Sequence, residues 1–291
     1  MVERHEILRT RFVKSPDGVW GEVVSAPAPL IDEVRLAEHG GPVSEDVLHR
    51  HLAKVTGAPF QLDRCPLLRA QVVHITEQHA VMLIVMHHIV SDQWTFAELG
   101  RELAAHYNAI QCGTPAALPS LPIQYADHAS WHRSWFEGDR RATEIAYWSR
   151  RLDGLEPLPL NHDFPRPPTQ SFRGAALRWP LDPDHIAALR GLGAAHGASL
   201  SMVLIAALNV LLHRHTGKTD IGIGVPIANR HHLASENLIG SFVNTLVFRT
   251  DLGGDQDFRT VLSRVREVSL EAFAHQDMPF ELLVRELAAR Q

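Results

Sequence analysis

Ala80 to Trp94 read AVMLIVMHHIVSDQW, and this stretch carries the clearest structural signal in the chain. Its first seven residues are continuously apolar, which is typical of a strand buried on both faces of a helix-flanked sheet. A polar loop follows, and an apolar helical stripe then continues until Gly113. The stretch therefore predicts a strand, a loop and a helix, with Thr95 and Glu98 at the spacing of a capping box.

Further elements are expected on both sides of this stretch. Towards the N-terminus, the pattern predicts a hairpin from Leu8–Val13 and Trp20–Val24, a helix from Ser44 to about Val55 and a strand from Leu67 to Ile75. Towards the C-terminus, it predicts helices near 123–136, 139–152, 182–196, 200–215 and 258–275, and strands at 175–180, 220–227 and 242–250.

A proline-rich segment separates the two halves. It contains Pro157, Pro159, Pro165, Pro167 and Pro168, whose fixed φ angles and missing N–H donors exclude a helix. We therefore predict an N-terminal lobe over 1–155, a linker over 156–171 and a C-terminal lobe over 172–291. Since strands and helices alternate in both halves, each lobe is expected to be α/β.

Composition narrows the class of partner and the compartment. The net charge is −5 and the basic residues are scattered, which argues against a nucleic-acid or anionic-membrane surface. No apolar run is long enough to cross a bilayer. The two cysteines, Cys65 and Cys112, form no CxxC pair, which favours a reducing compartment. We expect a cytoplasmic protein with small-molecule or protein partners.

His87 and His88 stand where the predicted strand ends. Successive side chains of a strand point to opposite faces, so only one of the two can enter a given cavity. An imidazole at such a position can exchange a proton near neutral pH, although a histidine there is more often a hydrogen-bonded core residue. Asp92 can cap the following helix or accept a charged hydrogen bond. The pattern does not choose between the two histidines. No metal site is expected, because their side chains diverge and no HExxH or cysteine cluster is present.

HHIVSDQW resembles the HHxxxDG signature of nonribosomal-peptide-synthetase condensation domains, a family within the acyltransferase superfamily that includes chloramphenicol acetyltransferase. Other segments resemble further motifs of this family in the same order. They are Arg4–Phe12 (RHEILRTRF), Tyr147-Trp148 with Leu152, Ile239–Leu246 (IGSFVNTL) and His275–Phe280 (HQDMPF). The resemblance implies a two-lobed, chloramphenicol-acetyltransferase-like α/β sandwich in which helices flank a mixed sheet in each lobe.

The same resemblance assigns roles to individual residues. It makes His88 the active-site base or positioning group and leaves His87 structural. Asp92 would brace the motif loop through an ion pair with Arg230, which lies in a family-like PIANR segment. Candidates for lining the site are Ser91, Gln93, Trp94 and Asn244. Gln93 departs from the family, which has glycine there, and Trp94 matches members that accept L-configured donors.

The activity that the resemblance implies is amide-bond formation in secondary-metabolite and antibiotic biosynthesis. Donor and acceptor peptidyl carrier proteins would present their substrates on phosphopantetheine arms, with an adenylation domain nearby and no cofactor bound directly by the chain. The two substrates would meet at His88 in a channel between the lobes. Rival hypotheses are an inert fragment or interaction remnant, an epimerase and a free-standing acyltransferase; FVNTL and HQDMPF favour condensation over epimerisation.

Measured against the family pattern, the chain begins inside the RHExLRTxF region and ends soon after HQDMPFELL. Each lobe is thus expected to be incomplete and to expose sheet edges. We predict that residues 1–291 alone are unstable or prone to aggregation.

Overall fold

The computed structural model describes residues 1–16, 18–25, 31–36, 43–165, 167–171 and 174–288. Contacts group the chain into two units, one comprising Met1–Trp135 with Ala228–Val243 and the other Phe136–Ile227 with Asn244–Gln291. This division differs from the predicted boundary at 156–171. The helix after Phe136 belongs with the second unit, and a late segment returns to the first.

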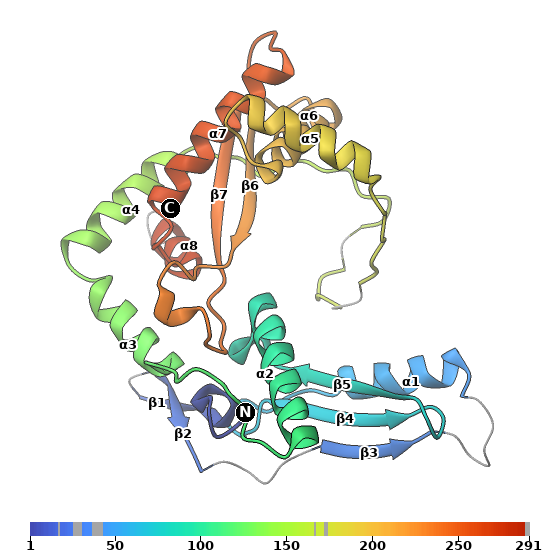
Figure 1. Cartoon of the computed structure of the whole chain (residues 1–291). Coiled ribbons are helices and arrows are strands. Elements are labelled where there is room, and N and C mark those ends of the chain that lie inside the picture. The colour runs from blue at the N-terminus through green and yellow to red at the C-terminus, as the bar shows by residue number, and fades with distance from the viewer. Residues whose placement is uncertain (17, 26–30, 37–42, 166, 172–173, 289–291) are drawn as a thin grey trace. The chain divides into compact units, whose positions relative to one another are not determined.

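In its described part, the first unit contains a hairpin, a mixed sheet and three α-helices. Its elements are η1 (Glu6–Arg9), β1 (Thr10–Ser15), β2 (Gly18–Val23), β3 (Ile31–Arg35), α1 (Glu45–Thr56), β4 (Leu68–His74), β5 (Ala80–Met86), η2 (His88–Val90), α2 (Gln93–Cys112), α3 (Tyr125–Trp135) and η3 (Leu233–Ser235). β1 pairs antiparallel with β2, and the order β3-β4-β5 combines one parallel and one antiparallel ladder. Figure 1 shows α2 crossing this three-stranded sheet.

β5 has the predicted bounds, but the prediction that both of its faces are buried is wrong. It is an edge strand in the described sheet, and Met82 is 40% exposed. The continuous apolar run of β5 therefore did not mean that other elements cover both faces of the strand. β3 was not predicted, because its sequence IDEVR places two acidic residues in five and lacks a regular alternation.

α2 carries the side chains that join it to the rest of the first unit. Its N-cap is Asp92, which forms the capping box with Thr95, so the predicted Thr95–Glu98 box is wrong by one turn. The helix ends at Gly113 in the left-handed conformation, as predicted. Leu99 packs in a buried cluster with Ile7, Leu8, Leu67, Val90 and Ile239.

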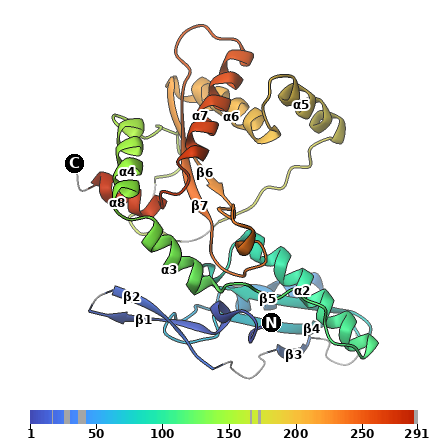
Figure 2. The same ribbon diagram turned by 60° about the vertical axis from the view of Figure 1, so that its left-hand side comes forward.

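The second unit contains α4 (Asp139–Leu152), α5 (Pro183–Ala195), α6 (Leu200–Thr216), β6 (Asp220–Ile227), β7 (Asn244–Asp251), α7 (Phe258–Ala274) and α8 (Phe280–Ala288). Figure 2 shows α7 beside the β6–β7 ladder. The predicted strand at 175–180 is absent from the described residues, and α8 was not predicted. Among the described residues this unit has a two-stranded antiparallel ladder in place of the mixed sheet expected for each lobe.

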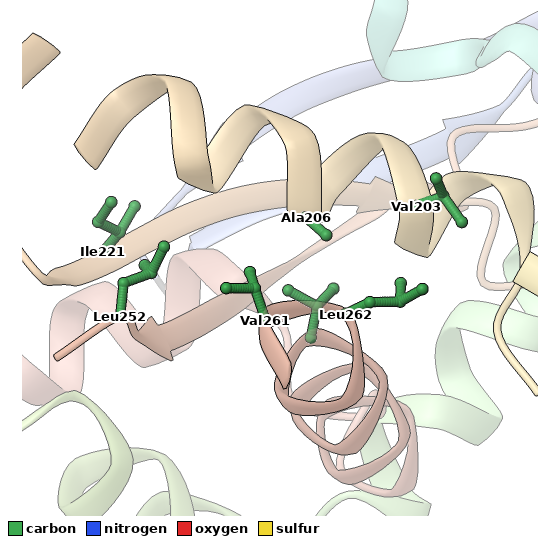
Figure 3. Close-up of a cluster of buried hydrophobic side chains, with 7 residues drawn as sticks. Val203, Ala206, Ile221, Leu252, Val261 and Leu262 are labelled. Carbon is green, nitrogen blue, oxygen red and sulfur yellow. The ribbon is translucent and has the colours of Figure 1, made fainter. Parts of the chain in front are cut away.

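The core of the second unit lies between α6, β6 and α7. Val203 and Ala206 of α6 are fully buried against Ile221 of β6 and Leu262 of α7, as Figure 3 shows. Burying such side chains contributes about 1.5–3 kcal/mol each for the larger ones, so this cluster stabilises the ladder. In the described part of the chain no single helix meets the length and hydropathy required to span a membrane, whereas α5 and α6, bent by 97° at their junction, meet them only as a pair.

Candidate active site

His88 is the first residue of η2, directly after β5 and His87. It therefore stands in a turn rather than on the strand, so the alternation argument does not apply to it. Its side chain is exposed, while Val90 and Ser91, two and three residues later, are buried. Within the described residues its imidazole makes no hydrogen bond, so both ring nitrogens are available to another molecule.

His87 has the opposite environment. Its Nδ1 accepts a hydrogen bond from the Ile89 N–H at 3.0 Å, so the neutral ring carries its proton on Nε2. Its backbone N–H donates to the Leu67 carbonyl at 3.0 Å, and its ring packs edge-on against Phe60. These contacts make His87 the N-cap of η2 and leave His88 as the available imidazole.

Asp92 and Arg230 form a buried ion pair within the first unit. Arg230 Nη2 lies 3.2 Å from each carboxylate oxygen, and the two side chains are 5% exposed for Asp92 and 1% for Arg230. This is the pairing that the resemblance implies. Asp92 Oδ2 also accepts from the Phe242 N–H at 3.0 Å. The motif loop is thus bound to the segment Ala228–Val243 by side chain and backbone.

The Arg230 side chain is buried among backbone carbonyls and an aromatic ring. Its Nη1 donates to the carbonyls of Ser235 and Leu238, both at 2.7 Å, and its guanidinium lies 3.9 Å from the centre of the Phe242 ring. Burial lowers the pKa of Arg230, and Asp92 opposes that shift, so the cation is retained by its partner. A buried charge held in this way fixes the loop geometry more than it adds net stability.

The remaining residues of the motif divide into buried and exposed. Ser91 is 3% exposed and donates to the His87 carbonyl at 3.2 Å, so it supports the turn. Trp94 is 45% exposed, and its indole N–H donates to the Glu236 carbonyl at 2.9 Å. Gln93 is exposed and opens α2.

Gln93 replaces the glycine of the family signature without backbone strain. It is helical, and Asn229 is the one non-glycine residue in the described part of the chain with a positive φ, 52°. Glycine is required only where φ is positive or a neighbour comes too close. The departure from the family pattern therefore leaves the loop conformation unaffected.

Asn244 belongs to the second unit and has a structural environment. Its Nδ2 donates to the carbonyls of Gln276 at 2.9 Å and Met278 at 2.8 Å, and its Oδ1 accepts from the Phe280 N–H at 3.0 Å. The side chain thereby holds the HQDMPF segment at the start of β7.

Sequence reasoning missed Thr95, which hydrogen-bonds to Asp92, and Gly240, whose N–H and carbonyl both hydrogen-bond to the Thr95 hydroxyl. The sequence predicts a capping box that begins at Thr95, whereas Thr95 occupies the third helical position after Asp92 and is fully buried. The Asp-x-x-Thr spacing was a signal for that position.

In the described residues, no group of three or more His, Cys, Asp or Glu side chains is arranged to hold a metal ion.

Comparison with known proteins identifies the family. The model of the condensation domain matches residues 1–291. The chain is 42% identical over 292 residues to a linear gramicidin synthase from Brevibacillus parabrevis, covering 99% of this chain and 4% of that protein. It is 41% identical over 288 residues to malpibaldin synthetase from Mortierella alpina, covering 97% of this chain and 5% of that protein. The chain thus spans a small part of the length of these curated relatives.

Solved structures agree with the fold. The X-domain from teicoplanin biosynthesis is 30% identical with a TM-score of 0.88, and 99% of this chain covers 64% of that one. The same X-domain has been solved in complex with OxyB, with a TM-score of 0.86. The first condensation domain of the calcium-dependent antibiotic synthetase has a TM-score of 0.80 at 24% identity, over 98% of this chain and 68% of that one, which supports the fold alone. The family-model match over the whole chain and the 42% identity to a linear gramicidin synthase show that the protein belongs to the condensation-domain family.

Proposed function

We propose that this chain joins a donor acyl or peptidyl thioester to the amine of an acceptor aminoacyl thioester, and that His88 acts at the reacting amine. Donor and acceptor peptidyl carrier proteins would deliver the substrates on phosphopantetheine arms, in a protein that also contains adenylation domains. One observation carries the proposal. His88 is exposed and makes no hydrogen bond to the described residues, while Asp92, at the other end of the same loop, is buried and ion-paired with Arg230.

The proposed reaction is aminolysis of a thioester. The acceptor nitrogen attacks the donor carbonyl, a C–N bond forms and the C–S bond breaks, and the proton lost from the amine passes to the departing thiolate, so that the donor arm leaves as a free thiol. Because amines attack thioesters readily, orientation of the two arms supplies much of the acceleration, up to about 7–11 kcal/mol in well-oriented systems. His88 would accept the amine proton or hold the amine in line.

We extend the proposal to the architecture of the intact domain, for which we infer the two-lobed, chloramphenicol-acetyltransferase-like sandwich. Support comes from the similarity to solved condensation-type domains, of which this chain covers about two thirds. The Asp92–Arg230 pair would then be a structural brace, and Gln93 and Trp94 would be the exposed residues of the motif nearest to the substrates.

The test is amide formation by the wild-type protein with one loaded donor carrier and one loaded acceptor carrier, followed by mass spectrometry of the acceptor arm. We expect product from the wild type, at least about 100-fold less from His88→Ala, and none when the acceptor carrier is left unloaded. The absence of product from the wild type with any of a panel of donor–acceptor pairs would reject the proposal.

A second function is favoured by one specific observation. The X-domain, at 30% identity, has been solved in complex with OxyB. On that analogy this chain would bind a partner protein, and for binding alone His88 would be dispensable. The same experiment separates the two functions, because equal product from the wild type and His88→Ala, or no product from either, favours the binding role.

A further inference from the structure

The hydroxyl of Thr95 lies at the meeting point of two segments that are far apart in sequence. Its Oγ1 accepts from the Gly240 N–H at 3.2 Å and from the Asp92 N–H at 3.3 Å. It lies 3.0 Å from both the Gly240 carbonyl and Asp92 Oδ1, so its single proton is donated to one of them or shared. A hydroxyl has one proton and two lone pairs, and every one of these is used here.

The groups around the Thr95 hydroxyl are buried, so a water molecule cannot take the place of that hydroxyl. Thr95 is fully buried, and Asp92 is 6% exposed. Gly240 is buried as well, and a Cβ added to it would lie 2.2 Å from the Tyr125 ring, which means that only glycine fits. Tyr125 in turn donates to the Ser241 carbonyl at 2.8 Å. If the hydroxyl were removed, the buried N–H groups of Gly240 and Asp92 would lose a partner that nothing else described in the first unit replaces.

We propose that Thr95 is a positioning residue for the reaction and acts through Asp92 on His88. Asp92 follows His88 by four residues, and η2, with Val90 fully buried, joins the two. Fixing Asp92 to Gly240 therefore fixes the turn that carries the imidazole. The inference rests on the proposed function, since it concerns the place where His88 meets substrate. A displacement of about 1 Å is enough to lower a rate up to 100-fold.

The chain contains its own control for the local part of this role. Asp257 caps α7 as Asp92 caps α2, with Thr260 three residues later. The Thr260 N–H and hydroxyl lie 2.8 Å and 2.7 Å from Asp257 Oδ1, matching the Thr95 geometry, and both residues are less buried than Asp92 and Thr95. No hydrogen bond from the Thr260 side chain to a distant segment is recorded in the described residues. Thr260→Val thus removes a capping hydroxyl alone, whereas Thr95→Val removes the cap and the link to Gly240.

Two measurements on the protein test the inference. The first is the single-turnover rate of amide formation at saturating carriers for the wild type, Thr95→Val, Thr95→Ser and Thr260→Val. We expect Thr95→Val to be about tenfold slower with half-saturation unchanged within about twofold, and Thr95→Ser and Thr260→Val to stay near the wild type. The second follows the His88 Cε1–H NMR signal and the amide exchange of Gly240, neither of which needs substrate. Thr95→Val should shift the signal and speed the exchange at least about tenfold, while Thr260→Val leaves both unchanged.

Equal behaviour of Thr95→Val and Thr260→Val in both measurements would overturn the inference, as would a Thr95→Ser variant as slow as Thr95→Val. If Thr95→Val does not fold, Thr95→Cys takes its place, because the thiol is close to the serine hydroxyl in shape but is a weak hydrogen-bond donor. Cys and Ser variants with equal rates would then refute it. If the wild type forms no amide, the proposed function fails, and the NMR and exchange data still decide whether Thr95 positions His88.

Discussion

Asp92 accepts hydrogen bonds from three directions, and this explains why one carboxylate organises the site. Its oxygens receive the Thr95 N–H at 2.9 Å, the Phe242 N–H at 3.0 Å and Arg230 Nη2 at 3.2 Å. The family resemblance predicted the Arg230 pairing. The sequence did not predict the hydrogen bond from the Phe242 N–H. A backbone donor that lies 150 positions away from its acceptor requires no particular residue type.

At this scale we predict that Asp92→Asn lowers the free energy of unfolding of the first unit by about 3 kcal/mol. The amide keeps the shape of the carboxylate but leaves the buried Arg230 charge uncompensated. The control is Asp220→Asn, which breaks the half-exposed pair with Arg249 in the second unit and should cost about 1 kcal/mol or less. Urea unfolding of both variants measures the difference; equal losses would show that burial of the Asp92–Arg230 pair has no energetic consequence.

At the scale of elements, the long periodic helices were predictable and the short or edge elements were not. The expected ranges for α4, α5, α6 and α7 lie within a residue or two of the observed ones, because each has a capping residue or a strong apolar stripe. Residues 175–180 alternate like a strand, with Leu177 and Trp179 on one side, but these side chains are 90% and 78% exposed and no described strand pairs with them. Alternation indicates a strand only where a partner edge exists.

α3 carries a histidine whose protonation is opposed by its neighbours. Burial, together with His132, His232, His231 and Arg230, lowers the pKa of His128 to about 4, and its ring packs against Phe242 at 4.8 Å. Because the unfolded chain binds this proton near pH 6.5, the stability that neutral His128 provides is fully present above about pH 6.5. It is lost as the pH falls from there towards 4.

We therefore predict that His128→Gln flattens the decline in unfolding free energy between pH 7 and pH 4.5. The exposed His49 of α1 offers a matched substitution. His49→Gln should leave the dependence of unfolding free energy on pH as it is in the wild type. Denaturant unfolding at a series of pH values measures both. A His128→Gln profile parallel to that of the wild type would mean that His128 is protonated as easily in the folded state as in the unfolded one.

At the scale of the whole molecule, exposed apolar side chains gather on one helix of the second unit. Leu204, Leu208 and Leu211 of α6 are 42%, 40% and 51% exposed and follow the spacing of one helix face. Contiguous apolar surface of this kind promotes association. The sequence did not predict where these exposed leucines lie, since the apolar run of α6 gives no indication of which face is covered.

Residues 1–291 produced alone are predicted to self-associate at micromolar concentration. Replacing Leu204 and Leu208 by Gln should shift the sedimentation profile towards the monomer, whereas replacing the fully buried Val203 by Ala should destabilise the second unit without that shift. A monomeric wild-type chain that melts cooperatively would contradict the prediction.

The central claim is that His88, held by a buried brace, acts in the chemical step. The most direct measurement is the single-turnover rate of amide formation at saturating loaded carriers for His88→Ala beside His87→Ala, together with the dissociation constant of each carrier. We predict that His88→Ala lowers the rate by about 100- to 10,000-fold without changing carrier binding. A His88→Ala rate within about twofold of the wild type, at equal carrier occupancy, would contradict it.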